Sequence, residues 1–417
     1  MDLNEINLYV IDEQSLGSKY GIGTYLNQIT DVAKQYNLNL TIIKLYCGIE
    51  NVLIIDHLYY TEMQIPICNN GSFFCDFNIA KYSKSVVFIL KKYINKNNII
   101  FHLNSTSSPD LMFWLRKMFS CKILLTIHYT TLSINLFGDV ELLNNIKSKK
   151  RLCLSPSEQE ILRSVNLEEL SINESDMNIF ISNESKSKID KSYNIVNKNF
   201  QIIHNCLKDE FVSIEQNLKK ESRCQFGINE NTNIILYVGR IEELKGVKYL
   251  IEAFNELLTV ISNCHLVIIG EGDFSSAMKL SYNRWSKISF LGFLNRTELN
   301  KIYSISDVGV VPSLYEEFGY TCVEMMMHRI PLVVSDVGGL SEIIVDGYNG
   351  LKIPVEKDIH GCSHVSSYLI YNKLKLIIEN EELRDYLADN ARSTFINKYG
   401  LSNYSQKMIS LYIDINK

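Results

Sequence analysis

Short apolar runs alternate with longer mixed stretches through the first half of the chain. The apolar runs have the length and composition of buried strands, and the stretches between them are long enough for helices. The segment 51–67, rich in Ile, Leu and Tyr, predicts a hairpin or two short strands. The expected strands are 6–11, 40–47, 98–103, 122–128, 177–182 and 201–204, with helices over 25–36, 79–93, from 109 onward and over 139–166.

A second series of the same kind follows a polar stretch. Strands separated by helical runs predict parallel sheets with crossover helices, so we expect an α/β protein of two doubly wound Rossmann-like domains facing a cleft. The expected division is 1–206 for the first domain, 207–232 for a linker, 233–395 for the second domain and 396–417 for a helix crossing back to the first. The second series has strands at 233–238, 265–269, 288–291, 307–311, 331–334 and 351–353, and the tail over 366–416 is helical.

Composition narrows the class of protein. At 417 residues and 48.0 kDa the chain exceeds the usual size of a single core. A net charge of -5 argues against a nucleic-acid binder. The start, Met1-Asp-Leu-Asn-Glu, is acidic and lacks the basic region of a signal peptide, and no run of eighteen apolar residues predicts a membrane span. The ten cysteines form no C-x-x-C pair, which is typical of free thiols in a reducing cytosol, so we expect a cytoplasmic protein.

The stretch 313–324 carries the strongest chemical signal. It joins the apolar run 307–311, closed by a proline, to a helix expected over 320–328, so it lies where open α/β sheets bind their ligands. The amides of Gly319, Tyr320 and Thr321 begin that helix and favour an anion. Two carboxylates, Glu316 and Glu324, stand eight positions apart. This combination predicts a ligand with both phosphate and sugar hydroxyls.

A second loop, 239–246, also follows a strand and precedes a helix. It offers the guanidinium of Arg240 and the ammonium of Lys245, a pair suited to neutralising a diphosphate. A solvated charged loop is the alternative. Because 313–324 is expected at the same sheet edge, the diphosphate site is the favoured interpretation.

Three features of the first half are weaker. Gly21-Ile-Gly23-Thr opens the first helix, where glycines allow close approach to a phosphate or simply make a tight turn. The third glycine of a dinucleotide fingerprint is missing. His128 ends a strand and is favoured as a site residue, whereas His102, in a similar place, could equally be a core histidine.

The densest basic run is Lys147, Lys149, Lys150 and Arg151. Such runs are usually solvated helix ends. This one could also contact anionic headgroups at the inner face of a membrane if the acceptor were membrane-borne.

With these residues identified, the chain resembles the retaining GT-B glycosyltransferases of family 4 (glycosyl transferases group 1). The resemblance is strongest over 231–355, where several short motifs occur in the family's order. In the first half it rests on Gly-Ile-Gly-Thr-Tyr at 21–25, Thr-Ile-His at 126–128, Ile-Ser-Asn-Glu-Ser at 181–185 and Ile-His-Asn at 203–205. The motifs of the second half are Gly-Arg…Lys-Gly at 239–246, Ile-Gly-Glu-Gly at 269–272, Leu-Gly-Phe at 291–293, Pro-Ser…Glu-x7-Glu at 312–324 and Asp-Val-Gly-Gly…Glu…Gly-x-x-Gly-Leu at 336–351.

The resemblance implies roles for the donor-side residues. Arg240 and Lys245 would hold the donor diphosphate and stabilise its charge as it leaves. Glu324 would bind the ribose, and Glu316 would contact the transferred sugar. Amides of Phe318, Gly319, Tyr320 and Thr321 would assist.

On the other domain, the resemblance places Gly23 near the phosphates and His128 near the sugar and the attacking hydroxyl. Two positions depart from the family pattern. Glu317 adds an acid where the family usually has a small residue, and Cys206 follows Asn205 where a glycine is common. The first could alter sugar choice or face solvent.

The implied reaction is the retaining transfer of a sugar from a nucleotide-diphosphate sugar to a hydroxyl of a glycan, glycolipid or polypeptide, as in the hexosyltransferase-type enzymes of class EC 2.4. No Asp-x-Asp motif occurs, so neither a motif-held metal nor any other cofactor is expected. The alternatives are an epimerase or hydrolase of the same fold and a non-catalytic nucleotide-sugar-binding subunit. The donor base, sugar, acceptor and oligomeric state stay open.

Overall fold

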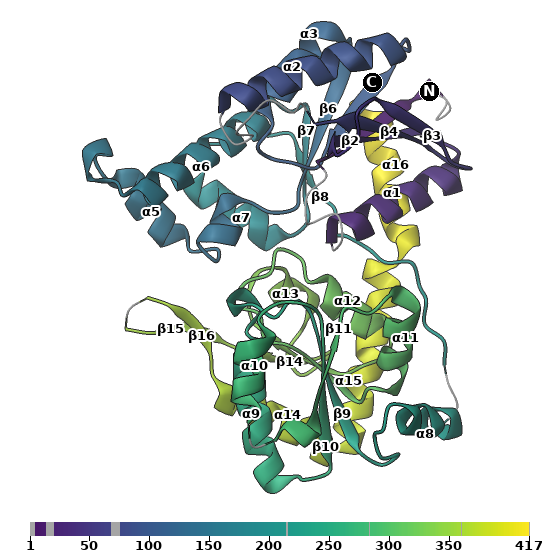
Figure 1. Cartoon of the computed structure of the whole chain (residues 1–417), viewed down its shortest axis with the longest axis vertical. Helices are drawn as coiled ribbons and strands as arrows, with labels where there is room; N and C mark the ends of the chain where they lie inside the picture. Colours follow the sequence, from purple (N-terminus) through teal and green to yellow (C-terminus); the bar gives the residue numbers. More distant parts are fainter. Residues whose placement is uncertain are drawn as a thin grey trace. The chain divides into compact units, whose positions relative to one another are not determined.

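The computed structural model describes residues 5–13, 21–67, 76–213, 216–282, 284–359 and 361–416. These residues form two compact units, which can be followed in Figure 1. The N-terminal unit takes the chain through Cys206 and again from Ser402, and the C-terminal unit runs from Leu207 to Leu401. Each unit is built on its own, mainly parallel sheet with helices between the strands, so the expected α/β class is confirmed.

The sheet of the N-terminal unit has the strand order β3-β4-β2-β1-β5-β6-β7-β8 across the described residues. Neighbouring strands are parallel except β3 and β4, which form the hairpin expected over 51–67. The order reverses between β1 and β5, which is the switch point of a doubly wound sheet. The strands are β1 Asn7–Glu13, β2 Asn39–Cys47, β3 Leu53–Asp56, β4 Thr61–Pro66, β5 Ile99–Leu103, β6 Cys121–Ile127, β7 Met177–Phe180 and β8 Phe200–Ile202.

The middle of this sheet is apolar and buried on both faces, which is why it requires helices on each side. All five residues of β5 are buried, and helix α1 buries Ile29 and Val32 while its outer face is polar. The helices of the unit are α1 Gly21–Tyr36, α2 Asp76–Tyr93, α3 Pro109–Met118, α4 Thr131–Asn135, α5 Val140–Ser148, the short η3 Arg151–Cys153, α6 Pro156–Glu174, α7 Asn183–Ser192 and the last helix, α16 Leu401–Ile415.

Helix α16 belongs to the N-terminal unit although it is the end of the chain. Its Tyr412 is fully buried, and the Tyr412 hydroxyl lies 3.0 Å from Nδ1 of His102 on β5. The chain approaches this helix through a π-helical turn, Phe395–Tyr399, which is still part of the C-terminal unit. The last helix therefore completes the core of the unit that the chain had left at Cys206.

The C-terminal unit has a parallel sheet in the order β11-β10-β9-β12-β13-β14, the order of a doubly wound nucleotide-binding fold. Its switch point lies between β9 and β12. A separate antiparallel pair, β15 Val355–Lys357 and β16 Ser363–Val365, was not expected. The other strands are β9 Asn233–Val238, β10 Cys264–Ile269, β11 Ile288–Gly292, β12 Val308–Val311, β13 Leu332–Ser335 and β14 Leu351–Ile353. The helices are α8 Gln216–Gln225, α9 Val247–Val260, α10 Phe274–Leu280, α11 Arg296–Ile305, α12 Tyr320–Met327, α13 Gly338–Ile343, α14 Ser367–Glu379 and α15 Glu381–Thr394, with short turns η4 Glu243–Lys245 and η5 Trp285–Lys287.

The linker expected over 207–232 needs correction, because this segment contains α8 and is part of the C-terminal unit. Although α8 is polar in composition, one of its side chains is buried and fixes the helix to the rest of the unit. Arg223 is 7% exposed, and its Nη2 donates to both carboxylate oxygens of Asp307 at 2.6 Å. Arg223 also donates to the carbonyls of Ile305 and Thr232. Arg223, together with Lys219, whose Nζ lies 3.1 Å from Oδ1 of Asp307, thus ties the helix to the sheet where an apolar face would normally do so.

Candidate functional site

Two loops meet at the switch point of the C-terminal sheet. One follows β9 and contains Arg240 and Lys245, and the other follows β12 and contains 313–319. β9 and β12 are neighbours in the sheet, so their carboxyl ends lie at one edge. A backbone hydrogen bond from Leu314 N to Leu244 O, 2.8 Å long, joins the loops directly. The sequence therefore predicted correctly that these loops would lie at one sheet edge.

Lys245 and Glu316 form the central contact of this site. Nζ of Lys245 lies 2.6 Å from Oε1 of Glu316, and Oγ of Ser313 donates to the same oxygen at 3.0 Å. The two charged side chains are 19% and 17% exposed. Because each is largely enclosed and has a fixed partner, both are held in place at the sheet edge before any ligand binds.

Arg240 lies on the same loop but faces a different direction. Its guanidinium is 50% exposed and its Nη2 lies 2.9 Å from Oε1 of Glu242. Its backbone is fixed, since the hydroxyl of Tyr237 donates to the Arg240 carbonyl at 2.7 Å. An exposed guanidinium on a fixed backbone can still rotate toward an anionic ligand.

The start of helix α12 lies beside the Lys245–Glu316 pair. Gly319 is its N-cap, with φ of 99°, and no side chain caps the helix. A Cβ at Gly319 would lie 2.6 Å from Cδ2 of Leu340, so glycine is needed here for both space and conformation. Phe318 is 3% exposed and its ring packs edge-on against Tyr320 and Tyr399. Its side chain is therefore a core element, and only its backbone could serve a ligand.

The first two residues of α13, which follow β13 closely, contact the backbone of Glu316. Gly339 N donates to the Glu316 carbonyl at 2.8 Å. Gly338 has φ of 48°, and a Cβ there would lie 1.8 Å from the same carbonyl oxygen. The glycine pair thus permits a close backbone approach that fixes the Glu316 turn. Glu317, the departure from the family pattern, is half-buried rather than fully in solvent.

Glu324, on helix α12, lies in a charged cluster that the sequence did not reveal. Its Oε1 is 2.5 Å from Nη1 of Arg296, and its Oε2 accepts a 2.7 Å hydrogen bond from the hydroxyl of Tyr303. Nε of Arg296 donates in turn to Oε2 of Glu210 at 2.7 Å. These two carboxylates raise the pKa of the Arg296 guanidinium above its usual range, against the opposing effect of burial.

The N-terminal unit carries the remaining predicted residues. His128 follows β6, and its Nε2 lies 3.2 Å from Oδ1 of Asn104. The Tyr25 ring packs edge-on against it at 4.3 Å. Burial lowers the pKa of His128 to about 3, so the ring is neutral at pH 7. It can donate or accept a hydrogen bond but adds no positive charge.

His102 is a core residue, which resolves the alternative left open by the sequence. It is fully buried, and its ring nitrogens lie 2.7 Å from Oγ1 of Thr126 and 3.0 Å from the Tyr412 hydroxyl. Burial lowers the pKa of His102 to about 3 as well. Both ring nitrogens are engaged inside the protein, so none is available to a ligand.

Gly23 lies in the first turn of α1 and is half-buried. Its role at a phosphate stays a prediction. The site residues that sequence reasoning missed are Ser313, Arg296, Tyr303 and Asn104, since each acquires its partner only through the fold.

The matches to known proteins agree with this geometry. Residues 219–394 match the family model described as glycosyl transferases group 1. A glycosyltransferase of Methanocaldococcus jannaschii is 32% identical over 252 residues, which cover 59% of this chain and 62% of the relative. The chain spans between half and two thirds of the length of the first curated relatives it matches.

Two solved structures share the fold along nearly the whole chain. Sucrose-phosphate synthase of Thermosynechococcus elongatus superposes with a TM-score of 0.75 at 18% identity, covering 98% of this chain and 99% of its own. HepE of Anabaena, solved in complex with UDP-glucose, gives a TM-score of 0.70 at 16% identity over 98% of this chain and 99% of its own. Residues 219–394 are therefore similar to the glycosyl transferases group 1 family, and the chain has the GT-B fold.

Proposed function

We propose that this protein is a retaining glycosyltransferase that moves a sugar from a nucleotide-diphosphate sugar to an acceptor hydroxyl. The observation that carries the proposal is the Lys245–Glu316 pair, held at the switch point within the matched family region. A cation for a diphosphate and a carboxylate for sugar hydroxyls stand side by side there. In a nucleotide-diphosphate sugar the diphosphate and the sugar meet at the bond that breaks, so the cation and the carboxylate are both needed there.

In the proposed reaction the bond between the anomeric carbon and the diphosphate oxygen breaks. The acceptor oxygen forms a new bond to that carbon on the same face, and the acceptor proton passes to the departing phosphate. Negative charge accumulates on the leaving group, so fixed cations and dipoles lower the barrier most. Lys245, Arg240 and the uncapped start of α12 would supply that stabilisation, without a metal ion.

The carboxylates take separate parts in this proposal. Glu316 would accept hydrogen bonds from hydroxyls of the transferred sugar. For this, the ammonium of Lys245 would move from Glu316 to the diphosphate. Glu324 would accept the ribose hydroxyls while Arg296 and Tyr303 keep its orientation. We propose a uridine nucleotide as the donor's base, because HepE was solved with UDP-glucose.

His128 and Gly23 would serve from the N-terminal unit. The neutral His128 can hydrogen-bond the sugar or the acceptor hydroxyl, and Gly23 leaves room for a phosphate at the start of α1. The acceptor would be a glycan, glycolipid or polypeptide.

Peripheral contact with a membrane stays a proposal, with one change to the residues involved. Lys147 is turned inward, with Nζ 2.6 Å from Oε1 of Glu169, so it would not contribute. Lys150 and Arg151 are exposed, and Lys149 is paired with Glu158. In the described ranges no helix combines the length and the apolar character that a membrane crossing needs.

Two experiments test the proposal. A thermal-shift screen of UDP-, GDP- and ADP-sugars identifies the donor, because a ligand at a hundred times its Kd stabilises by about 2.7 kcal/mol. Incubation of that donor with candidate acceptors then separates the functions by product. A glycosylated acceptor with the donor's anomeric configuration supports the proposal. Free sugar or an epimer alone would indicate the hydrolase or epimerase, and binding with no product would indicate a binding subunit.

A further inference from the structure

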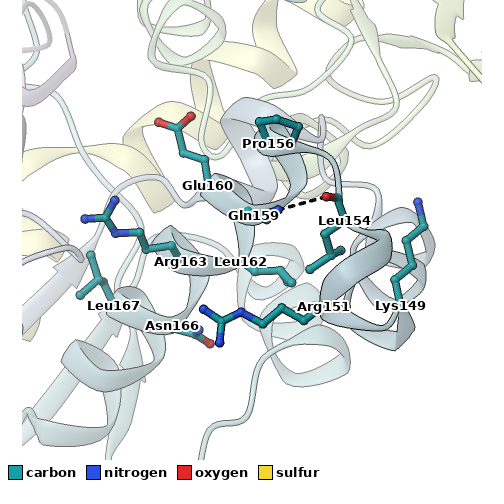
Figure 2. Close-up of a pocket in the computed structure, with 10 residues that line it drawn as sticks. All are labelled: Lys149, Arg151, Leu154, Pro156, Gln159, Glu160, Leu162, Arg163, Asn166 and Leu167. Carbon is teal, nitrogen blue, oxygen red and sulfur yellow. Dashed lines mark hydrogen bonds between the residues drawn. The ribbon is translucent and has the colours of Figure 1, made fainter.

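A cavity of about 940 Å³ lies in the N-terminal unit, and none of its lining residues belongs to the candidate donor site. It is formed by η3 and the first half of α6, and Figure 2 shows its side chains. Its size falls within the range of small-molecule sites. It is lined by Lys149, Arg151, Leu154, Pro156, Gln159, Glu160, Leu162, Arg163, Asn166 and Leu167.

The apolar part of this cavity is anchored in the protein core. Leu154 and Leu162 are half-buried and pack against the hydrophobic core of the N-terminal unit. The loop that carries Leu154 is fixed to the start of α6, where Gln159 donates to the Leu154 carbonyl at 3.1 Å. The leucines therefore form a firm floor rather than a surface that only forms on binding.

The rim of the cavity is cationic. Lys149, Arg151 and Arg163 line it, against one lining carboxylate, Glu160. Lys149 is already neutralised, since its Nζ lies 2.6 Å from Oε1 of Glu158. The guanidinium of Arg151, by contrast, has no hydrogen bond or ion pair with any residue that the structure describes, and Figure 2 shows it extending along the cavity toward Asn166.

An exposed leucine stands next to this arginine. Leu152 is 100% exposed on η3, a position that a solvated helix end gives no reason to fill with a large apolar side chain. The segment 151–163 thus carries a guanidinium without a partner, a second arginine and accessible leucines. Charge complementarity and apolar contact both point to a ligand that combines an anion with a hydrocarbon chain.

We propose that this cavity binds the phosphate group of an anionic amphiphile. Arg151 and Arg163 would bind the phosphate oxygens, because guanidinium groups form paired hydrogen bonds with phosphate. Leu154 and Leu162 would contact the adjoining carbons, and Leu152 would insert beside them. The ligand could be a lipid headgroup in a bilayer or a dispersed phosphorylated amphiphile. The inference goes beyond the proposed transfer reaction, since this binding requires neither donor nor turnover.

The test measures binding by the full chain without any nucleotide sugar. The probes are vesicles of phosphatidylcholine with and without one third phosphatidylglycerol, the short-chain amphiphile dihexanoyl phosphatidic acid, and inorganic phosphate. The double variant R151E/R163E should bind anionic vesicles or the short-chain amphiphile at least roughly 20-fold more weakly, since each basic residue near an anionic surface contributes about fivefold. Leu152→Ser should weaken binding several-fold without changing its salt dependence.

Matched controls separate this site from general charge attraction. The double variant K92E/K96E makes the same two charge reversals at exposed lysines on and just after α2, and Leu170→Ser removes a leucine that is 52% exposed on α6 outside the cavity. Both should bind within twofold of the unchanged protein, and thermal unfolding checks that each variant is folded.

Each outcome decides the matter. Binding to anionic vesicles that R151E/R163E loses supports a headgroup in a bilayer, and binding to the short-chain amphiphile alone supports a dispersed ligand. The proposal is overturned if neither is bound, if K92E/K96E weakens binding as much as R151E/R163E, or if inorganic phosphate binds as tightly as the amphiphile. Failure here leaves the transfer reaction untouched, because that reaction is measured by product.

Discussion

Replacing Lys245 by methionine tests the proposed donor site most directly. Methionine keeps most of the side chain's length but removes the ammonium that lies 2.6 Å from Oε1 of Glu316. If that ammonium stabilises the departing diphosphate, kcat should fall by roughly 10²–10³, or about 2.7–4 kcal/mol of transition-state stabilisation. Release of nucleoside diphosphate, measured at saturating donor, gives kcat without interference from weaker donor binding.

The same substitution also affects stability, so the two effects must be separated. Glu316 would keep the Ser313 hydroxyl but lose its cation in a place where its side chain is 17% exposed. Exposed pairs contribute about 0–1 kcal/mol and breaking a buried pair costs about 3–5 kcal/mol, so we expect a loss of roughly 1–3 kcal/mol. Urea unfolding measures it.

The double variant K245M/E316Q distinguishes folding from chemistry. Removing the carboxylate charge as well should restore most of the lost stability, because no unpaired charge remains, but it should not restore turnover. Lys248→Met is the matched control, since Lys248 is 43% exposed and lies 3.8 Å from Glu243 in a weak surface pair. The reasoning is refuted if Lys245→Met retains kcat within twofold, or if the double variant regains both stability and turnover.

Three further predictions concern the framework of the two units. Arg223→Met should cost about 3 kcal/mol in urea unfolding, the lower end of the usual loss for a broken buried pair, because Asp307 keeps only Lys219, whose Nζ lies 3.1 Å from Oδ1; a loss below 1 kcal/mol would contradict the anchoring role of α8. The pKa of His102 is about 3 in the folded chain against about 6.5 unfolded, so the unfolded state binds more protons between these values and stability falls as pH drops through this window. Going from pH 7 to pH 5 should cost about 2 kcal/mol from this residue, and His102→Gln should lose correspondingly less over the same change; an equal loss in both proteins would rule out His102 as the source. Gly338→Ala should displace the Glu316 turn and lower kcat at least tenfold, whereas unchanged kinetics would show that the 1.8 Å approach relaxes without consequence.

Much of the fold was predictable because each element has a local signal. The largely apolar run of β5, interrupted only by His102, and the proline-closed run of β12 both indicated buried strands. The meeting of Lys245 and Glu316 was also predictable, since parallel strands bring their carboxyl ends to one edge. In these cases the sequence pattern identifies the strands, and the rule for parallel sheets then gives the position of the loops that follow them.

Other features depend on distant partners and had no local signal. The segment 207–232 looked like a linker because its polar composition gives no sign that Arg223 is buried against Asp307, 84 residues away. His102 and His128 follow the same pattern at neighbouring strands, yet Tyr412, from the far end of the chain, engages a ring nitrogen of His102. Pairwise contacts of this kind are set by the fold and not by spacing.

The cluster around Glu324 changes what this carboxylate can do. The family resemblance implied that this carboxylate binds ribose hydroxyls, but both of its oxygens already accept hydrogen bonds, from Arg296 and Tyr303. Each carboxylate oxygen can accept a second hydrogen bond, so ribose need not displace either partner. Arg296 is itself shared with Glu210, in the segment just after the chain leaves the N-terminal unit. A ribose that competed for Arg296 would loosen this segment, whereas one that only adds to Glu324 would leave it fixed. The enclosed geometry of Glu324, whose side chain is 13% exposed, favours the second, so in the proposed donor site the carboxylate would be preorganised for ribose rather than released by it.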